Sequence, residues 1–359
     1  MRYNILFVGL INAILIESKE VFASDSFSYS EAVTTRKIHK RRILMKHLLL
    51  PKEKKQYIAN LHCHTTLSDG RKTPEEIRDA YKAQGYSIVA FSDHDNYFDH
   101  SDFCTEDFVA INSFEADISD NIVKSSQFRR CYHLNAFNIN GDKEVTLPAT
   151  PDYRDMQAVN GYIQKLKELG FIVAYNHPYW SMQCLDDYRD LKGCSMIEIY
   201  NNSVFVEGGD DGQEQVYDEM LRSGKRLFCT MADDNHNEFP FGDVRCDSFG
   251  GKTVFLCDTL SYESVINAMQ NGSFYCTREP RIFELTLEDG VVHIECSPAQ
   301  RIALSTAGRR SKALHAPAGE YVTQADFLLE DEDVYFRIEV TGPSGKKANT
   351  NAYFIEDYE

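Results

Sequence analysis

The feature that most constrains the fold is a regular alternation of apolar, strand-length runs with amphipathic segments, which begins at Tyr57. A short apolar run is typical of a buried strand, whereas apolar residues spaced three and four apart indicate a helix. Seven runs occur: YIANLHCH (57–64), YSIVAFSD (86–93), FVAINSFE (108–115), CYHLNAFNI (131–139), FIVAYNHP (171–178), SMIEIYNN (195–202) and RLFCTMAD (226–233). Strands that alternate with helices pair in parallel, and seven units suit a barrel better than an open sheet. We therefore predict an α/β fold in which residues 45–278 form a seven-stranded (β/α)7 TIM-like barrel.

Helix boundaries are marked between several of these runs. Thr73-Pro74-Glu75-Glu76 is a capping box with proline at the first helical position, and the helix it opens is predicted to stop at Gly85. Similar helices are predicted from about Met156 to Leu169, from about Gln213 to Arg222 and over 261–272, each with a glycine at or near its end.

After about Arg278 the pattern changes to alternating apolar and polar residues. RIFELTLEDGVVHIECSP contains two such runs around a Glu-Asp-Gly turn, and DVYFRIEVTGPSGKKANTNAYF resembles a second hairpin around Gly-Pro-Ser-Gly. We therefore predict a small all-β domain over residues 279–359. We expect this domain to pack or to bind a partner without carrying chemistry.

Residues 1–44 are predicted to be an N-terminal extension. The apolar run ILFVGLINAILI (5–16), with Arg2 before it and Ala23 after it, resembles a signal peptide, but it is too short to span a bilayer comfortably. Charged residues crowd the expected cleavage region, and a strongly basic segment follows. We favour translation from Met45 and a cytoplasmic protein; export after cleavage is the alternative.

Charge and cysteine content limit the classes of partner. The formal net charge of −17 at pH 7 leaves no surplus of Lys and Arg to displace counterions from nucleic acid. We therefore expect no broad nucleic-acid-binding surface, although a local patch or a bound metal can reverse the charge locally. We expect no membrane partner. The ten cysteines are scattered without a C-x-x-C pair, which is typical of reduced thiols in a cytosolic protein.

Residues of metal-binding type gather where the predicted strands end. His62 and His64 end the first run, and they project together because residues i and i+2 share one face of a strand. In a barrel, the carboxyl ends of the strands meet at one mouth, so residues distant in the sequence converge there. Nine candidate metal ligands follow this pattern: His62, His64, Asp69, His94, Glu115, His133, His177, Asp234 and His236.

A cluster of this composition is difficult to bury without cations. It contains six of the eleven histidines, and each of its three carboxylates would cost several kcal/mol to desolvate alone. Imidazole and carboxylate without a thiolate set suit zinc, manganese or iron rather than calcium, and nine ligands fit two or three divalent ions. Three such ions against three carboxylates would leave a positive pocket, for which phosphate is the obvious anion.

The order of these motifs resembles that of the PHP superfamily, named for polymerase and histidinol phosphatase. The motifs are LHCHTTLSDG, FSDHD, the Glu of SFEAD, YHLNAF, NHP and the Asp-x-His of ADDNH, and they span residues 60–236. The resemblance implies a distorted seven-stranded barrel, a trinuclear centre and hydrolysis of phosphoesters. It also implies three ligand sets: His62, His64, Glu115 and Asp234 for one ion; Glu115, His133 and His177 for a second; Asp69, His94 and His236 for a third.

The metals suggest the reaction. A water that bridges two ions loses its proton near neutral pH and becomes the nucleophile, while the ions hold the phosphoryl oxygens. We therefore predict a hydrolase of phosphoric ester bonds with no catalytic side chain beyond the metal-bridging hydroxide. The expected substrate is a small phosphorylated molecule such as a nucleotide or a short oligonucleotide. Two alternatives stay open: a metal-bound regulatory or binding module without catalysis, and a hydrolase of another bond such as an amide.

Two departures from the family leave the substrate open. The segment between His133 and His177 is too short for the long helical insertion of relatives that act on nucleotide bisphosphates or short nucleic acids. Histidinol-phosphate phosphatases, in turn, generally lack a β domain such as residues 279–359.

Six further residues are weaker site candidates. Three carboxylates adjoin ligands or end a strand, and so could orient an imidazole or face the mouth: Asp95, Asp233 and Glu198. Three basic residues could clamp a substrate phosphate: Arg245, Lys252 and Arg278. For each of the six, an ordinary solvated or surface role is the alternative.

Overall fold

The computed structural model describes residues 45–209, 212–309 and 311–359. The predicted N-terminal extension, residues 1–44, lies outside the described residues, so the alternative start and the signal peptide stay predictions. None of the helices in the described part of the chain has the length and apolar character needed to cross a membrane. The cytoplasmic location also stays a prediction.

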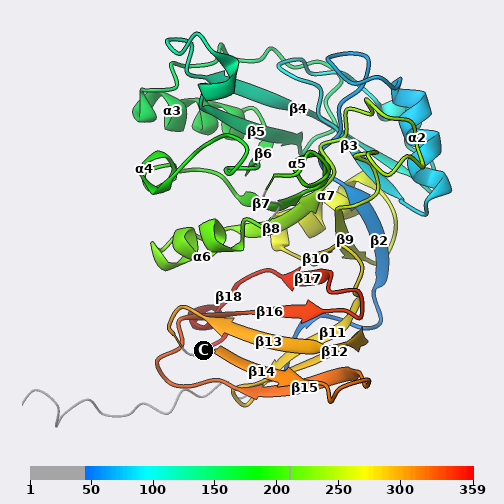
Figure 1. Ribbon diagram of the computed structural model, residues 1–359, viewed down its shortest axis with the longest axis vertical. Coiled ribbons are helices and arrows are strands. Elements are labelled where there is room, and N and C mark those ends of the chain that lie inside the picture. The colour runs from blue at the N-terminus through cyan, green and yellow to red at the C-terminus, as the bar shows by residue number, and fades with distance from the viewer. Residues whose placement is uncertain (1–44, 210–211, 310) are drawn as a thin grey trace, which may run out of the picture. The chain divides into compact units, whose positions relative to one another are not determined.

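Strands and short helices follow one another along the described chain (Figure 1). The strands are β1 (His47–Leu50), β2 (Lys55–Asn60), β3 (Ile88–Phe91), β4 (Val109–Ser119), β5 (Cys131–Asn138), β6 (Phe171–Tyr175), β7 (Met196–Asn201), β8 (Phe228–Ala232), β9 (Lys252–Cys257), β10 (Phe274–Thr277), β11 (Ile282–Glu288), β12 (Val291–Ala299), β13 (Arg301–Thr306), β14 (Ser311–His315), β15 (Val322–Leu328), β16 (Tyr335–Thr341), β17 (Lys347–Thr350) and β18 (Tyr353–Phe354). The α-helices are α2 (Pro74–Ala83), α3 (Met156–Glu168), α4 (Leu185–Tyr188), α5 (Asn202–Val206), α6 (Glu214–Arg222) and α7 (Tyr262–Asn271). Three 3-10 helices are η1 (Ser101–Phe103), η2 (Ser126–Phe128) and η3 (Ile355–Asp357).

The predicted positions of strands and helices are confirmed. Each of the seven apolar runs contains a strand, from β2 to β8, and the four predicted helices are α2, α3, α6 and α7. Thr73 caps α2 with both hydrogen bonds of the capping box. Gly272 ends α7 in the left-handed conformation that favours glycine.

The predicted (β/α)7 TIM-like barrel is wrong. The protein is mostly β, with 36% strand and 19% helix. β2, β3 and β4 pair in parallel, as do β6, β7 and β8, but β5 is antiparallel to both of its neighbours. β9 is antiparallel to β2. These strands belong to a 14-stranded mixed sheet in the order β14-β13-β16-β17-β10-β9-β2-β3-β4-β5-β6-β7-β8, with β18 paired to β16.

The barrel prediction failed because hydrophobic periodicity locates strands and helices without fixing the direction in which strands pair. Between β4 and β5 the chain contains only the three-residue helix η2, and a parallel crossover needs a longer connection. The strands therefore pair antiparallel, with Asp117 opposite His133. β5 and β6 are also antiparallel although α3 lies between them in the sequence.

The two hairpins predicted after Arg278 are present. β11 and β12 pair antiparallel around Asp289-Gly290, both of which have positive φ, as the tight turn requires. β16 and β17 form the second hairpin. β1, β11, β12 and β15 form a separate four-stranded sheet, whereas β17 pairs with β10 and so continues the large sheet (Figure 1). The domain boundary at residue 278 stays a prediction.

The backbone after β2 places two histidines on one side, as their spacing predicts. His62 and His64 are both buried and their Nε2 atoms lie 3.1 Å apart. The intervening Cys63 packs in an apolar cluster that includes Ile77 and Tyr81 of α2. This packing fixes the backbone from which the two imidazoles project.

Candidate metal centre

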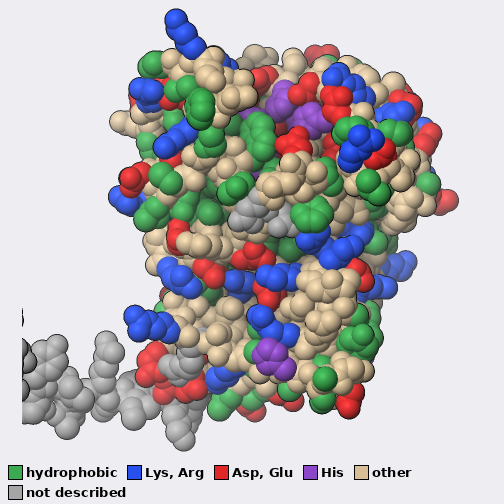
Figure 2. Space-filling model, viewed as in Figure 1, with side chains coloured by type: hydrophobic (Ala, Val, Ile, Leu, Met, Phe, Trp, Pro, Cys, Tyr) green, Lys and Arg blue, Asp and Glu red, His purple; other side chains and the backbone are tan. Residues whose placement is uncertain are grey.

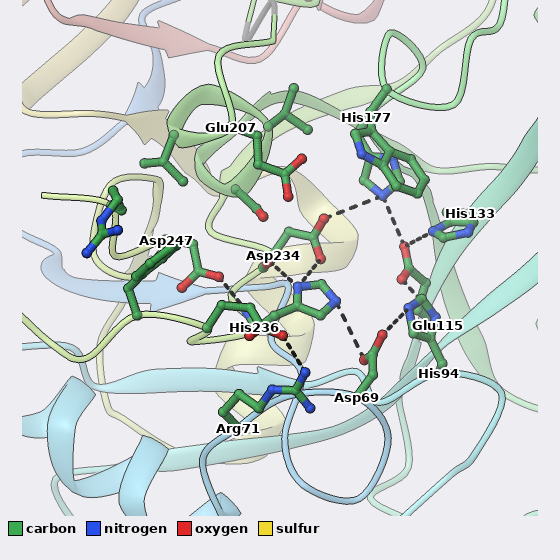
Figure 3. A pocket seen from close by; sticks show the side chains of 17 residues that line it. Asp69, Arg71, His94, Glu115, His133, His177, Glu207, Asp234, His236 and Asp247 are labelled. Atoms are coloured by element: carbon green, nitrogen blue, oxygen red, sulfur yellow. Dashed lines mark hydrogen bonds and ion pairs between the residues drawn. The ribbon is translucent and has the colours of Figure 1, made fainter. Parts of the chain in front are cut away.

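Glu115, in the middle of β4, is a buried carboxylate surrounded by imidazoles. Asn176 donates a hydrogen bond to its Oε1 over 2.7 Å. Five histidine nitrogens lie 3.2 to 3.4 Å from its oxygens: His62 Nε2 (3.2 Å), His64 Nε2 (3.4 Å), His94 Nδ1 (3.3 Å), His133 Nδ1 (3.2 Å) and His177 Nε2 (3.3 Å). Figure 3 shows His94, His133 and His177 around this carboxylate.

Asp234 is the second buried carboxylate of the cluster. Its Oδ1 lies 3.0 Å from Nε2 of both His62 and His64, and Asn201 donates to its Oδ2 over 3.0 Å. Asp234 and His177 both have positive φ, at 53° and 22°. Positive φ in non-glycine residues is costly and concentrates at functional sites.

Asp69 lies near three histidines at the solvent-exposed edge of the cluster. Its side chain is half exposed, and its carboxylate lies 3.5 Å from His236 Nε2 and 3.7 Å from both His94 Nε2 and His64 Nδ1. Figure 3 shows Asp69 between His94 and His236. All nine predicted ligands therefore converge on one region.

Several sets of these donors lie close enough together to hold an ion. Three have their ligand atoms within 4.8 Å of one another: His62, His64, Glu115 and Asp234; His64, Asp69, His94 and His236; and His94, Glu115 and His133. The first equals one predicted set, and the second contains another with His64 added. The third has His94 where the family resemblance implies His177. Which ligand serves which ion stays a prediction.

The chemistry of the donors fits metal ions. Five buried atoms of the cluster have no hydrogen-bond partner among the described residues: His64 Nδ1, His94 Nδ1, Glu115 Oε2, His177 Nε2 and Asp234 Oδ1. Leaving such atoms buried without partners is costly, and each atom carries a lone pair that a cation can accept. Imidazole and carboxylate together suit zinc, manganese and iron.

The electrostatics keep the carboxylates ionised. Burial raises the pKa of Glu115 and Asp234, but the neighbouring histidines, His62 above all, outweigh it and hold both pKa values well below the usual range. Burial lowers the pKa of His94 to about 4, so this imidazole is neutral at pH 7. Burial also lowers the pKa of His236, but the nearby carboxylates of Asp69 and Asp234 outweigh this effect and raise the pKa to about 9.

Two imidazoles are oriented by acceptors on the side away from the cluster. Nδ1 of His62 lies 3.0 Å from Glu198 Oε2, and Nδ1 of His236 lies 2.9 Å from the carbonyl oxygen of Asp234. Because an ionised carboxylate and a carbonyl can only accept, both Nδ1 atoms carry the proton and Nε2 faces the cluster. Asn201 donates to Glu198 as well as to Asp234, and so links the two carboxylates. The sequence places Glu198 at the site but gives no signal for Asn201.

The family resemblance is supported by a match of residues 60–117 to the PHP domain family. This segment of the chain is therefore similar to a PHP domain. It contains five of the nine candidate ligands: His62, His64, Asp69, His94 and Glu115. No curated protein matches the sequence.

Three solved structures are similar to this chain at low identity. A two-domain protein from Bacteroides vulgatus, containing a predicted PHP-like metal-dependent phosphoesterase, is 15% identical over 84% of this chain and 95% of its own, with a TM-score of 0.43. A proposed metal-dependent phosphoesterase from Bifidobacterium adolescentis is 16% identical over 51% of this chain and 90% of its own, with a TM-score of 0.36. An amidohydrolase from Chromobacterium violaceum with bound sulfate and no metal is 15% identical over 60% of this chain and 96% of its own, with a TM-score of 0.33. At these scores the similarities establish neither fold nor activity.

Asp233, next to the candidate ligand Asp234, accepts hydrogen bonds from a loop rather than from an imidazole. Its carboxylate accepts hydrogen bonds from the Tyr81 hydroxyl and from the backbone N–H groups of residues 249–251 over 2.7 to 2.8 Å. A Cβ on Gly251 would lie 2.3 Å from the carbonyl oxygen of Ala232, so only glycine fits this approach. Burial raises the pKa of Asp233 to about 6, and the hydrogen bonds from Gly251, Tyr81 and Phe249 limit the rise.

Asp247 supports the opposite end of the same loop. It accepts from the backbone N–H groups of His236 and Asn237 over 2.7 and 3.0 Å, and so fixes the segment that carries a predicted ligand. Sequence reasoning missed Asp247, because neither its spacing nor its neighbours form a motif.

Of the remaining weak candidates, Asp95 lies beside the donor cluster, whereas Arg278 and Lys252 make contacts elsewhere. Asp95 accepts from the backbone N–H of Asp117. The guanidinium of Arg278 stacks on the rings of Tyr200 and Phe205, at 4.2 and 4.5 Å from their centroids. Lys252 lines a different cavity, away from the nine ligands.

A first cleft of about 510 Å³ opens onto the cluster, and Arg245 is among the residues that line it; its role as a phosphate clamp stays a prediction. Arg71, which sequence reasoning missed, lines the cleft too, although it directly follows Asp69-Gly70 at the end of the motif LHCHTTLSDG. Trp180 and Phe239 supply apolar surface. Figure 2 shows histidine side chains at the surface beside acidic ones, and Figure 3 looks into this cleft.

A second cleft, of about 660 Å³, is also lined by residues of the cluster. It is lined by residues of the connection between β4 and β5, including Ser126, Gln127 and Arg129. Four residues line both clefts: Asp69, His94, His133 and Trp180. The sequence gives no signal for the second cleft, because its walls come from a loop without a motif.

Proposed function

We propose that this protein is a metal-dependent phosphoesterase. The observation that carries the proposal is the placement of Glu115 within 3.4 Å of five imidazole nitrogens, with Asp69 and Asp234 closing the cluster. The PHP match over residues 60–117 supports a metal-binding hydrolase. His62, His64, Glu115 and Asp234 would hold one ion, and the other donors would hold one or two more.

The side chains around the cluster prepare it for ions and for an anionic substrate. Glu198 keeps the proton of His62 on Nδ1, and the Asp234 carbonyl does the same for His236, so Nε2 of each ring can donate a lone pair. Divalent ions, when bound there, supply Lewis acidity for the phosphoryl oxygens and lower the pKa of water. Arg71 and Arg245 line the approach and provide charge for orienting an anion.

The decisive experiment measures metal content and hydrolysis together. Metals are quantified in the purified wild-type protein and in His62→Ala, and each preparation is assayed on phosphomonoesters, phosphodiesters and amides. We expect at least one bound divalent ion in the wild type, metal-dependent hydrolysis of a phosphoester, and loss of both in His62→Ala. His315→Ala, which changes an exposed histidine of β14, is the matched control and should keep both.

A second variant is needed because loss of metal and activity in His62→Ala could also result from unfolding. Asp69 is half exposed, so Asp69→Asn should fold while weakening one ligand set. Absence of bound metal in the wild type would refute the proposal. So would phosphoester hydrolysis that survives in both variants. Metal without phosphoesterase turnover would favour a regulatory module, and turnover of amides alone would favour the amide alternative.

A further inference from the structure

The candidate metal centre lies at the junction of two clefts. The first cleft extends past Arg71 and Arg245, and the second extends past Gln127 and Arg129. Both are lined by His94 and His133, whose Nδ1 atoms lie 3.3 and 3.2 Å from Glu115. A phosphoryl group held at these donors therefore lies next to both clefts.

We propose that the substrate is a phosphodiester, with one organic group in each cleft. This inference rests on the proposed phosphoesterase function and narrows it. A phosphomonoester has a single organic group and needs one cleft only. A diester has a second organic group on the phosphorus, for which the second cleft of about 660 Å³ provides room.

Arg129 gives the second cleft a binding group. Its Nε donates to the carbonyl oxygen of Val123 over 3.2 Å, and within the residues that the structure describes no carboxylate pairs with its guanidinium. Arg71 and Arg245, in contrast, are paired with Glu238 and Asp243. Arg129 therefore has donors to offer to a ligand without first breaking an ion pair.

The other charges of the second cleft indicate what Arg129 would bind. Asp95 and Asp117 also line this cleft, so its wall carries more negative than positive charge. A second phosphate group, with two negative charges, would be repelled there. A neutral or weakly charged organic group of the ester, with oxygen acceptors for Arg129, fits better.

Trp180 provides a surface that both organic groups can contact. It lines both clefts and is about half exposed. Its ring centroid lies 5.5 Å from that of His133 and 5.2 Å from that of His177. An aromatic ring next to the junction can stack against a planar substituent of the ester.

The test compares a diester with a monoester of the same leaving group. The metal-loaded wild-type protein is assayed on bis(p-nitrophenyl) phosphate and on p-nitrophenyl phosphate. We expect kcat/KM for the diester to exceed that for the monoester. In Arg129→Gln, the ratio of the two values should fall by about tenfold, mainly through KM for the diester, because one charge-assisted hydrogen bond is lost.

A second variant and a control make the test specific. Ser126→Trp narrows the second cleft without touching a candidate ligand and should also lower the diester-to-monoester ratio. Arg189→Gln, which alters an exposed arginine paired with Asp186 and lining neither cleft, should leave the ratio unchanged.

The phosphodiester proposal and the phosphoesterase proposal predict different results when they are wrong. Turnover of the monoester without the diester would overturn the present inference and leave the phosphoesterase function standing. An unchanged ratio in both Arg129→Gln and Ser126→Trp would also overturn it. Metal-dependent turnover of neither substrate would refute the phosphoesterase function itself.

Discussion

Glu198 contacts the imidazole of His62 on the side that faces away from the candidate metal centre. Its Oε2 lies 3.0 Å from His62 Nδ1, and its other oxygen accepts from Asn201, which also donates to Asp234. The carboxylate therefore fixes the tautomer of one ligand and is linked to a second. Such outer carboxylates raise the basicity of the imidazoles they contact.

Replacing Glu198 should weaken metal binding more than it weakens folding. We expect Glu198→Ala to lower the metal affinity by about 10- to 100-fold, because His62 loses the acceptor that orients it. Glu198→Gln keeps a hydrogen-bond acceptor but lacks the charge, so its metal affinity should lie between that of the alanine variant and that of the wild type. Metal titration monitored by calorimetry measures both. Glu288→Ala, an exposed carboxylate change on β11, is the control, and equal affinity in all four proteins would contradict the role of Glu198.

How far the sequence predicts individual site residues depends on the signal that each carries. The nine candidate ligands could be singled out because histidines and carboxylates recur at strand ends, where their burial is hard to explain otherwise, and the structure brings them together. Asn201 and Asp247 could not, because asparagine and aspartate are common in loops and their role depends on contacts made after folding. Arg129 could not, because its significance lies in a neighbouring cleft and in the lack of a carboxylate partner among the described residues.

Among the elements, α2 links the first motif to the loop at residues 249–251. Thr73 caps the helix, Ile77 packs beside Cys63, and the Tyr81 hydroxyl donates to Asp233 over 2.8 Å. Asp233 in turn holds the loop backbone. The helix therefore supports both segments that flank the cluster.

Loss of the α2 cap should lower the stability of the protein. We expect Thr73→Ala to reduce the free energy of unfolding by about 1 kcal/mol, because the N–H of Glu76 loses its acceptor. Thr73→Ser keeps the oxygen and should cost much less. Urea denaturation followed by circular dichroism measures the difference. If serine proves as destabilising as alanine, the methyl group rather than the cap accounts for the effect.

The elements themselves could be predicted from the sequence, but the way they pair could not. Capping boxes and terminal glycines are local signals, and α2 and α7 follow them. The antiparallel pairing of β5 with β4 and β6 depends on the path of the connecting chain, which no periodicity encodes. His133 reaches Glu115 from near the start of β5, because an antiparallel strand begins where its neighbour ends.

At the scale of the whole molecule, an ion pair joins α6 to the strands of the C-terminal part. Arg337 of β16 makes two hydrogen bonds of 2.9 Å to Asp218 of α6, and a third to Asn349 of β17. The arginine is almost fully buried. β17 also pairs with β10, so the same strands take part in one large sheet.

Breaking this pair should destabilise the whole described unit. We expect Arg337→Met to lower the free energy of unfolding by about 3 kcal/mol, because the largely buried Asp218 loses both 2.9 Å hydrogen bonds and keeps, among the described residues, only Arg222, at 3.8 Å. Arg281→Met, an exposed change, is the control. Unfolding followed by tryptophan fluorescence and by circular dichroism should give one coincident transition. Two separated transitions would show that residues 279–359 fold independently, as the sequence-based domain boundary predicts.

Removing metal should also lower stability across the molecule. Ions that bind only the folded state stabilise it by about 2.7 kcal/mol per site at a concentration one hundred times the dissociation constant. We therefore expect chelation by EDTA to lower the Tm and added zinc or manganese to restore it, as measured by calorimetry. The shift should be smaller in Asp69→Asn than in His315→Ala. A Tm that does not respond to chelation in any of these proteins would contradict a structural contribution of the ions.

Two candidate ligands and the arginines of the clefts lie on different kinds of element, and this difference has an evolutionary consequence. Glu115 and His133 lie on strands, whereas Arg71, Arg129 and Arg245 lie on connecting loops. Loops tolerate insertion and substitution more readily than paired strands. Homologues with the same strands can therefore change substrate preference by substitutions in these loops, while Glu115 and His133 stay in place. Grafting residues 120–130 from one homologue into another should transfer substrate preference without changing these two candidate ligands.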